Sequence, residues 1–123
     1  MAKIDRLRVH EKCNGHCSYC GKEITVKEMQ VDHVVPQWKQ KDPRYYKVDI
    51  DINSFENLMP ACRRCNHYKR GDGLESFRES MKTLHKRISD NYINKVGLDF
   101  GIMTLTPFSG TFYFEALKPT KDE

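Results

Sequence analysis

The chain of 123 residues lacks any apolar run long enough for a signal peptide or a membrane span. It also lacks internal repeats and low-complexity segments, and 38% of its residues are hydrophobic against 31% charged. These absences argue against a membrane partner, and the plain N-terminal sequence Met1–Asp5 favours the cytoplasm. So short and polar a chain is expected to form a single domain, residues 1–123, whose small core gains support from a bound metal.

Disulfide bonds are not expected in a cytoplasmic chain, so the five cysteines need another explanation. Cys13 is the odd one, either a thiol outside any metal site or an alternative ligand in a Cys13-x-x-x-Cys17 spacing. Gly21 and Lys22 follow the Cys-x-x-Cys pair, and glycine allows the tight turn of a zinc knuckle, which favours the pair. The four cysteines of the two pairs predict a closed and therefore structural zinc site: Cys17, Cys20, Cys62 and Cys65.

The patterns of apolar and β-branched residues predict an α+β fold. Val31–Val35 are β-branched or polar and predict a strand that ends at Pro36. An apolar stripe at helical spacing predicts a helix over residues 74–88. Further elements are expected as helices at residues 3–12 and 62–70, a turn and short strand at 54–60, and a β-hairpin at 102–106 and 111–117. The hairpin and the 74–88 helix would form a C-terminal extension, about residues 73–117, to a core of about residues 13–72.

A long loop, residues 37–53, separates the two strands expected in the core. Basic and aromatic side chains interleave in it, for example Trp38 and Lys39, then Arg44 and Tyr45. Long loops inside a compact domain are usually functional or disordered.

Asp32 and His33 stand near the end of the first expected strand. A neutral imidazole can take a proton from water near pH 7, so His33 is a candidate general base. The carboxylate of Asp32 is a hard oxygen ligand that suits Mg²⁺ or Mn²⁺. Asn57 is either a turn residue or an amide that fixes the orientation of the His33 ring. Taken alone, the Asp-His dipeptide is common, and a purely structural pair is the alternative.

The helix expected at residues 62–70 joins the second cysteine pair to amide and basic side chains. Residues four apart share a helix face, so Cys65 lies with Lys69, and Asn66 lies with Arg70 on the next face. The amide oxygen of Asn66 is a reasonable ligand for a hard cation. A basic cluster on this helix suits phosphate groups of DNA, with a solvated basic face as the alternative; its members are Arg63, Arg64, His67, Lys69 and Arg70.

The order of these motifs resembles that of the HNH endonuclease family. Residues 17–70 carry Cys-x-x-Cys-Gly-Lys, Val-Asp-His-Val-Val-Pro, Glu-Asn-Leu and Cys-x-x-Cys-Asn-x-x-Lys in that order. The segment Val31–Gln37 is also similar to the HNH nuclease domain of type II CRISPR effectors. The combination is more specific than any single motif. The resemblance implies a ββα-metal fold, in which two antiparallel strands and a helix surround one catalytic divalent ion.

The resemblance also implies roles for individual residues. His33 would be the general base, and Asn57 the middle asparagine that positions it. Asn66 stands at the third signature position, where many members have histidine, so the chain would be an HNN variant. Asp32 and Asn66 would ligate Mg²⁺ or Mn²⁺ together with DNA phosphate oxygens. His67 is a poorer match to the third position because one residue rotates it by about 100° around the helix.

A metal-dependent, nickase-like DNA endonuclease is therefore the predicted function. A zinc-stabilised nucleic-acid-binding module without catalysis is the alternative, and a zinc-knuckle module without a nucleic-acid partner is a third hypothesis. The formal charge of +4 agrees with a DNA partner. The loop at residues 37–53 lengthens the spacing between His33 and Asn57 beyond that of short family members, and it is interpreted as a DNA-contacting insertion, with a merely solvated loop as the alternative. A base, an orienting amide and two hard ligands in the family order favour the enzyme. Because an HNH core usually makes one cut, double-strand cleavage would require two copies or two events, and a homodimer or a larger phage or defence assembly would supply two copies.

Overall fold

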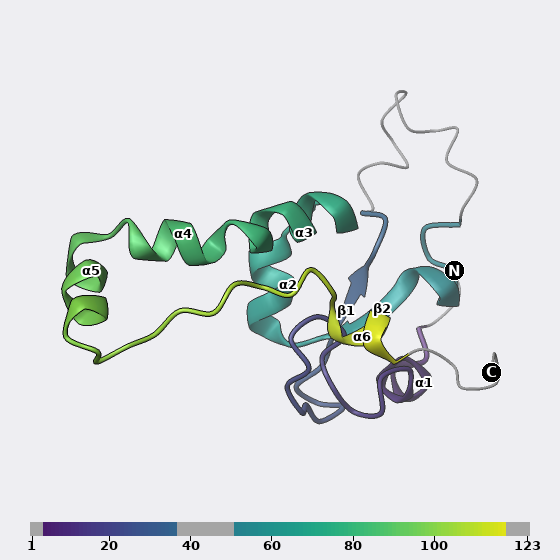
Figure 1. The fold of residues 1–123 in the computed structure, drawn as a ribbon. Coiled ribbons are helices and arrows are strands. Elements are labelled where there is room, and N and C mark those ends of the chain that lie inside the picture. The colour runs from purple at the N-terminus through teal and green to yellow at the C-terminus, as the bar shows by residue number, and fades with distance from the viewer. Residues whose placement is uncertain (1–3, 37–50, 118–123) are drawn as a thin grey trace, which may run out of the picture. The chain divides into compact units, whose positions relative to one another are not determined.

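The structure is a computed structural model that describes residues 4–36 and 51–117. The chain divides into two compact units, residues 1–73 together with 112–123, and residues 74–111. Figure 1 labels the elements of each unit. The insertion predicted at residues 37–53 lies almost wholly outside the described residues, so its DNA contacts stay a prediction.

The first unit is built on a two-stranded antiparallel sheet. β1 (Gln30–His33) pairs with β2 (Leu58–Ala61), and His33 stands opposite Leu58 in the register. The β-branched strand expected before Pro36 is confirmed, although the ladder ends at His33. The pairing continues for one more bond, because the Val34 amide donates to the Asn57 carbonyl at 3.0 Å. The end of β1 is therefore tied to the segment that leads into β2.

Two short helices pack on this sheet. α1 (Arg6–Glu11) packs against β2, and α2 (Arg63–Lys69) packs against β1. The 3₁₀ turn η2 (Phe55–Asn57) leads into β2. Both helices are confirmed predictions, and the order β1, β2, α2 is the ββα core that the resemblance implied. The fold class α+β is therefore confirmed.

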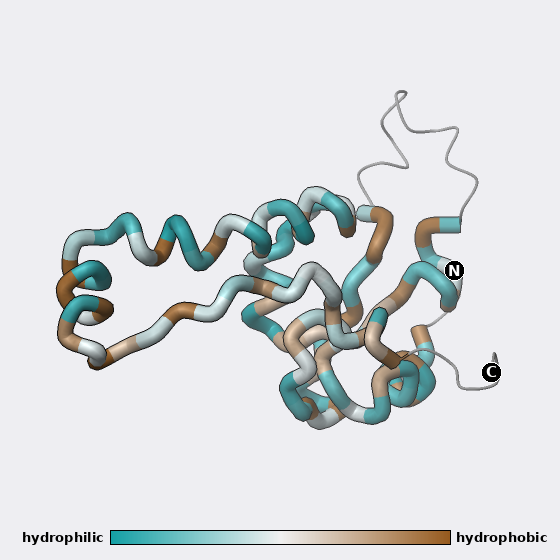
Figure 2. The backbone as a smooth tube through the Cα atoms, viewed as in Figure 1, coloured by the Kyte–Doolittle hydropathy of each residue, from teal (hydrophilic) through white to brown (hydrophobic). Residues whose placement is uncertain are grey.

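The second unit, residues 74–111, contains α3 (Leu74–Lys82), α4 (Leu84–Ser89) and α5 (Tyr92–Asp99). The helix predicted over residues 74–88 forms, with a break at Thr83. In Figure 2, hydrophobic residues recur between hydrophilic residues along α4, in agreement with the predicted apolar stripe. The guanidinium of Arg78 donates to the Gly110 carbonyl at 2.6 Å, which holds the segment after α5 against α3. None of the helices in the described part of the chain is both long and apolar enough to span a membrane.

The β-hairpin predicted at the C-terminal end is wrong. Residues 102–112, all described, form neither helix nor strand, and residues Tyr113–Ala116 form the short helix α6. The strand-prone aromatic residues pack instead on the first cysteine pair. Phe112 is buried with its ring 5.2 Å from that of Tyr19, and the Phe114 amide donates to the Ser18 carbonyl at 2.8 Å. These tertiary contacts outweigh the β propensity of the segment.

Candidate functional site

The two cysteine pairs meet in a compact sulfur cluster. The Sγ atoms of Cys17, Cys20, Cys62 and Cys65 all lie within 4.8 Å of one another. In a tetrahedral zinc site with Zn–S bonds of about 2.3 Å, the sulfurs are about 3.8 Å apart. The Sγ atoms of Cys20 and Cys62 are 3.9 Å apart, so the donor set and its spacing fit zinc. The four cysteines are thus placed to hold a metal ion.

The local sequence explains how the first pair reaches this cluster. Gly21 has a φ of 80°, and a Cβ at this position would lie 2.7 Å from the Tyr113 ring. Glycine is therefore required by both the backbone and the close approach of the ring, as the knuckle motif predicted. On the other side, the Cys62 sulfur accepts a hydrogen bond from the Cys65 amide at 3.4 Å and caps α2.

The cysteine thiols differ in their pKa. A hydrogen bond with the Cys65 thiol lowers the pKa of Cys17 to about 4, so the thiolate form of Cys17 is favoured. Cys13 is buried and lies outside the four-cysteine cluster. Burial raises its pKa to about 11, which keeps it a neutral thiol at pH 7. The interpretation of Cys13 as a thiol outside the site therefore agrees with the structure.

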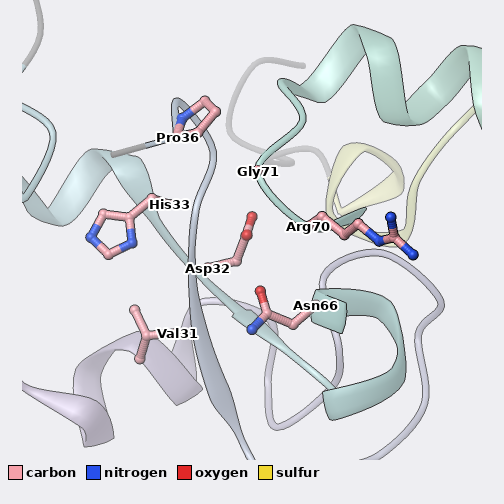
Figure 3. Close-up of a pocket in the computed structure, with 7 residues that line it drawn as sticks. All are labelled: Val31, Asp32, His33, Pro36, Asn66, Arg70 and Gly71. Atoms are coloured by element: carbon pink, nitrogen blue, oxygen red, sulfur yellow. The ribbon is translucent and has the colours of Figure 1, made fainter. Parts of the chain in front are cut away.

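A pocket of about 480 Å³ opens where β1 ends beside α2. The predicted base His33 and the predicted ligands of the catalytic ion, Asp32 and Asn66, border it. Figure 3 shows the side chains of His33 and Asp32 leaving the strand in opposite directions, and both border the pocket because it lies at the strand end. Its remaining lining residues are Val31, Pro36, Arg70 and Gly71.

Asp32 is held from two sides inside this pocket. It is only 4% exposed, the Tyr19 hydroxyl donates to its Oδ2, and the Lys69 ammonium lies 3.3 Å from each of its oxygens. Burial raises the pKa of Asp32 above its usual range, while the Tyr19 bond and the Lys69 charge act to lower it. Burial and the neighbouring carboxylate raise the pKa of Tyr19, so its hydroxyl keeps its proton and donates. The carboxylate therefore has two fixed partners.

The prediction that Lys69 contacts DNA is wrong. Lys69 is fully buried, and its ammonium also donates to the His33 carbonyl at 3.3 Å. Lys69 lies on the buried face of α2, four residues after Cys65, so its ammonium cannot reach a DNA phosphate in solvent. Lys69 instead ties α2 to the end of β1.

We expect the variant Lys69→Met to unfold more easily, with a free energy of unfolding lower by about 3–5 kcal/mol, because it leaves the Asp32 carboxylate buried without its cation. Urea denaturation of the zinc-loaded protein measures the change. The exposed cation Arg64 on the same helix provides the control, since Arg64→Met should change stability by no more than about 0.5 kcal/mol. Equal stabilities for the two variants would show that the buried ion pair contributes nothing.

The His33 ring has a side-chain partner that the sequence did not reveal. Its Nε2 lies 3.1 Å from Oδ1 of Asn53. An amide oxygen only accepts, so this contact assigns the hydrogen of the neutral ring to Nε2 and leaves Nδ1 as the basic nitrogen. Asn57, four residues after Asn53, makes its side-chain hydrogen bonds with main-chain atoms of Val35 and Ile52.

Asn57 fixes the main chain that follows His33. It is 1% exposed, and its Oδ1 accepts from the Val35 amide at 2.8 Å. Its Nδ2 donates to the carbonyls of Val35 and Ile52 at 3.1 and 2.7 Å. The amide was expected to hydrogen-bond near His33 and to fix the orientation of its ring, and these side-chain bonds go to main-chain atoms of Val35 and Ile52. Asn57 is thus suited to hold the position of the His33 backbone.

Asn66 and His67 face different hollows of the surface. The Nδ2 of Asn66 donates to Oε1 of Gln30 at 2.7 Å, and Figure 3 shows the amide oxygen on the side that faces Asp32. His67 borders a separate cleft of about 450 Å³. The rotation of one residue along α2 therefore separates the two side chains, as the helix geometry predicted.

This second cleft is lined by basic side chains, and we call it the basic cleft: Lys22, Arg63, Arg64 and His67. Three of these were predicted to contact DNA, and the structure adds Lys22 from the first cysteine knuckle. Arg70, also predicted to contact DNA, lines the pocket with Asp32. The residues that sequence reasoning missed are Lys22, Tyr19 and Asn53. Lys22 follows Gly21 directly, whereas nothing in the sequence marks the other two.

A model of the HNH endonuclease family matches residues 17–71. A curated relative is the CRISPR-associated endonuclease Cas9 of Corynebacterium diphtheriae, with 34% identity over 68 residues. That match covers 55% of this chain but only 5% of the relative. A solved structure, the Type II-C Cas9 enzyme from Actinomyces naeslundii, shares 28% identity with a TM-score of 0.48. It covers 63% of this chain and 8% of that one. The similarity to the HNH endonuclease family is therefore carried by residues 17–71 of this chain.

Proposed function

We propose that this chain is a metal-dependent DNA endonuclease that hydrolyses one phosphodiester bond per event. The observation that carries the proposal is the pocket bordered by Asp32, His33 and Asn66. A carboxylate, an imidazole and an amide meet there, in the order of the family signature. The family match and the endonuclease name of the Corynebacterium diphtheriae relative support the same activity.

The donors in the pocket suit a hard divalent ion. Mg²⁺ and Mn²⁺ prefer oxygen ligands, and the Asp32 carboxylate and the Asn66 amide oxygen lie on neighbouring elements at the pocket. These two residues would hold the ion, which would supply stabilisation of the negative charge that develops on the phosphate. The bond from Nδ2 of Asn66 to Gln30 keeps the amide oxygen free to face Asp32.

The chain's own residues provide the proton transfer. His33 would take a proton from the attacking water through Nδ1, because Nε2 is engaged with Asn53. Lys69 and Asn57 hold the main chain of His33 and Val35, so the ring starts from a fixed backbone. Fixed placement of the base beside the phosphate removes part of the entropic barrier to hydrolysis.

The basic cleft would receive DNA phosphates on either side of the scissile bond. Arg63 and His67 of α2 line the cleft, and Arg70, which follows the last residue of α2, lines the catalytic pocket, so the cleft and the pocket border the same helix. Phosphate contacts of this kind give affinity and register without reading sequence. Nothing else among the described residues near the pocket indicates a preferred base sequence.

We expect the double variant Lys22→Ala, Arg63→Ala to bind DNA more weakly at every sequence. Loss of two phosphate contacts should reduce the slope of log affinity against log salt by about 2. Fluorescence anisotropy with a labelled duplex at several salt concentrations measures both quantities. The exposed Lys27, outside both clefts, gives the matched control Lys27→Ala, whose slope should equal that of the wild type. An unchanged slope in the double variant would show that DNA phosphates do not bind in the basic cleft.

A plasmid assay tests the proposed function itself. The zinc-loaded wild type, with Mg²⁺ or Mn²⁺, should convert supercoiled plasmid to open circles, because the described residues form one pocket with these donors. Without a divalent ion, the plasmid should stay supercoiled. DNA binding without nicking, under any divalent ion, would instead support the nucleic-acid-binding module that lacks catalysis.

A further inference from the structure

Tyr19 lies inside the first cysteine pair and reaches the catalytic pocket. Its main-chain amide lies 3.4 Å from the sulfur of Cys17, within hydrogen-bond reach. Its side chain is 4% exposed, and its hydroxyl donates to Oδ2 of Asp32. One residue thus contacts the sulfur cluster through its backbone and the proposed ligand of the divalent ion through its side chain.

The ring of Tyr19 has little freedom to move. The rings of Phe112 and Phe114 stand edge-on to it, with centroids 5.2 and 6.2 Å away and interplanar angles of 82° and 88°. The Tyr19 carbonyl accepts from the Tyr113 amide at 3.2 Å. Packing against these two rings and a fixed backbone therefore determine where the hydroxyl lies.

The other partner of Asp32 contacts both of its oxygens. The Lys69 ammonium donates to Oδ1 at 3.3 Å and also lies 3.3 Å from Oδ2. The Tyr19 hydroxyl donates to Oδ2. Oδ2 therefore has both Tyr19 and Lys69 beside it, whereas Oδ1 has Lys69, so Oδ1 retains more of its capacity to accept a ligand in the pocket.

We propose that Tyr19 is a positioning residue that couples the four-cysteine cluster to divalent-ion binding, by holding Oδ2 of Asp32 and presenting Oδ1. The inference rests on the proposed function, because it takes Asp32 as a ligand of the catalytic ion. Partners that orient a metal ligand typically change metal affinity by about 10–100-fold when they are removed. Formation of the cysteine knuckle is then a condition for the catalytic ion to bind well.

The test compares Tyr19→Phe with the wild type in the full, zinc-loaded chain without DNA. Titration calorimetry with Mn²⁺ should show affinity weaker by about 10-fold or more in the variant, with zinc content unchanged. Tyr113→Phe is the matched control, since it removes a hydroxyl from a ring packed on Gly21 in the same knuckle. The control should bind Mn²⁺ as the wild type does.

A second readout separates positioning from a general loss of structure. Plasmid nicking by Tyr19→Phe should need a higher Mn²⁺ concentration, and its rate at saturating Mn²⁺ should return close to that of the wild type. If Tyr19→Phe fails to retain zinc, Phe112→Leu is the second variant, because it weakens the packing against the Tyr19 ring and keeps the Tyr19 hydroxyl. A several-fold loss of Mn²⁺ affinity is expected in Phe112→Leu.

Two results would overturn the inference, and they are distinguishable. If Tyr19→Phe, or Phe112→Leu in its place, binds Mn²⁺ as tightly as the wild type, the coupling is absent and the proposed function stands. If the wild type itself binds no Mn²⁺ and nicks no plasmid, the proposed ion site fails and the coupling with it.

Discussion

The variant His33→Ala should nick plasmid about 10²–10⁴-fold more slowly than the wild type, the range typical for loss of a general base. The imidazole borders the pocket, and its Nε2 is engaged with Asn53 at 3.1 Å. That contact leaves Nδ1 to accept the proton of the attacking water. No other described side chain of the pocket lining carries a neutral base of suitable strength, since the remaining polar groups there are Asp32, Asn66 and Arg70.

The loss should be confined to the chemical step. His33 is half-buried and makes its main-chain bond to Lys69 through a carbonyl that alanine retains. Zinc content, DNA affinity and Mn²⁺ affinity should therefore match the wild type. His67→Ala is the matched control, because His67 lines the basic cleft and not the catalytic pocket. It should weaken DNA binding modestly and keep the nicking rate at saturating DNA.

Single-turnover rates at saturating DNA and Mn²⁺ provide the measurement. A His33→Ala rate within a few-fold of the wild type would remove His33 from the mechanism. A large loss of nicking rate in His67→Ala at saturating DNA would indicate that the general base is His67 on α2. It would also contradict the assignment of Asn66 as the third signature residue.

The core of this fold could be predicted because its local signals agree with its tertiary contacts. Val31–Val35 are β-branched or polar and precede a proline, and the first three of them lie in β1, Gln30–His33. The second cysteine pair starts a helix in both the prediction and the structure. The meeting of Asp32 with Asn66 followed from motif order, since both ends of the ββα unit are fixed by cysteines of the same cluster.

The remaining features depend on partners far apart in the sequence. Lys69 shares a basic run with exposed arginines, and only its pairing with Asp32, 37 residues away, shows that it is buried. Phe112 reads as part of a strand until its packing on Tyr19 is known. The side-chain amide of Asn57 bonds to main-chain atoms of Val35 and Ile52, and no pattern in the sequence indicates these partners. Burial and long-range contact, which are not local properties, account for each difference.

We propose that the four-cysteine cluster holds zinc, and loss of this ion should unfold the first unit. Its elements are short, four residues in each strand and seven in α2, and isolated elements of this length are marginal in water. The first knuckle carries the contacts that join them: the Ser18 amide donates to the Pro60 carbonyl of β2 at 2.8 Å, and Tyr19 contacts Asp32 of β1. Structural zinc binds with about 10–16 kcal/mol, comparable to the roughly 5–15 kcal/mol that stabilises a whole domain.

We therefore expect Cys62→Ser, or the wild type after chelation, to lack a cooperative thermal transition in near-ultraviolet circular dichroism. Cys62 is the sharpest choice because its sulfur both belongs to the cluster and caps α2. Cys13→Ala is the matched control, since Cys13 is equally buried but lies outside the cluster, and it should keep one zinc per chain and a clear transition. Mn²⁺ should not restore the chelated protein, because it prefers oxygen donors to thiolates. A Cys62→Ser protein that retains zinc and the wild-type midpoint would show that the cluster is not what holds the two strands and α2 together.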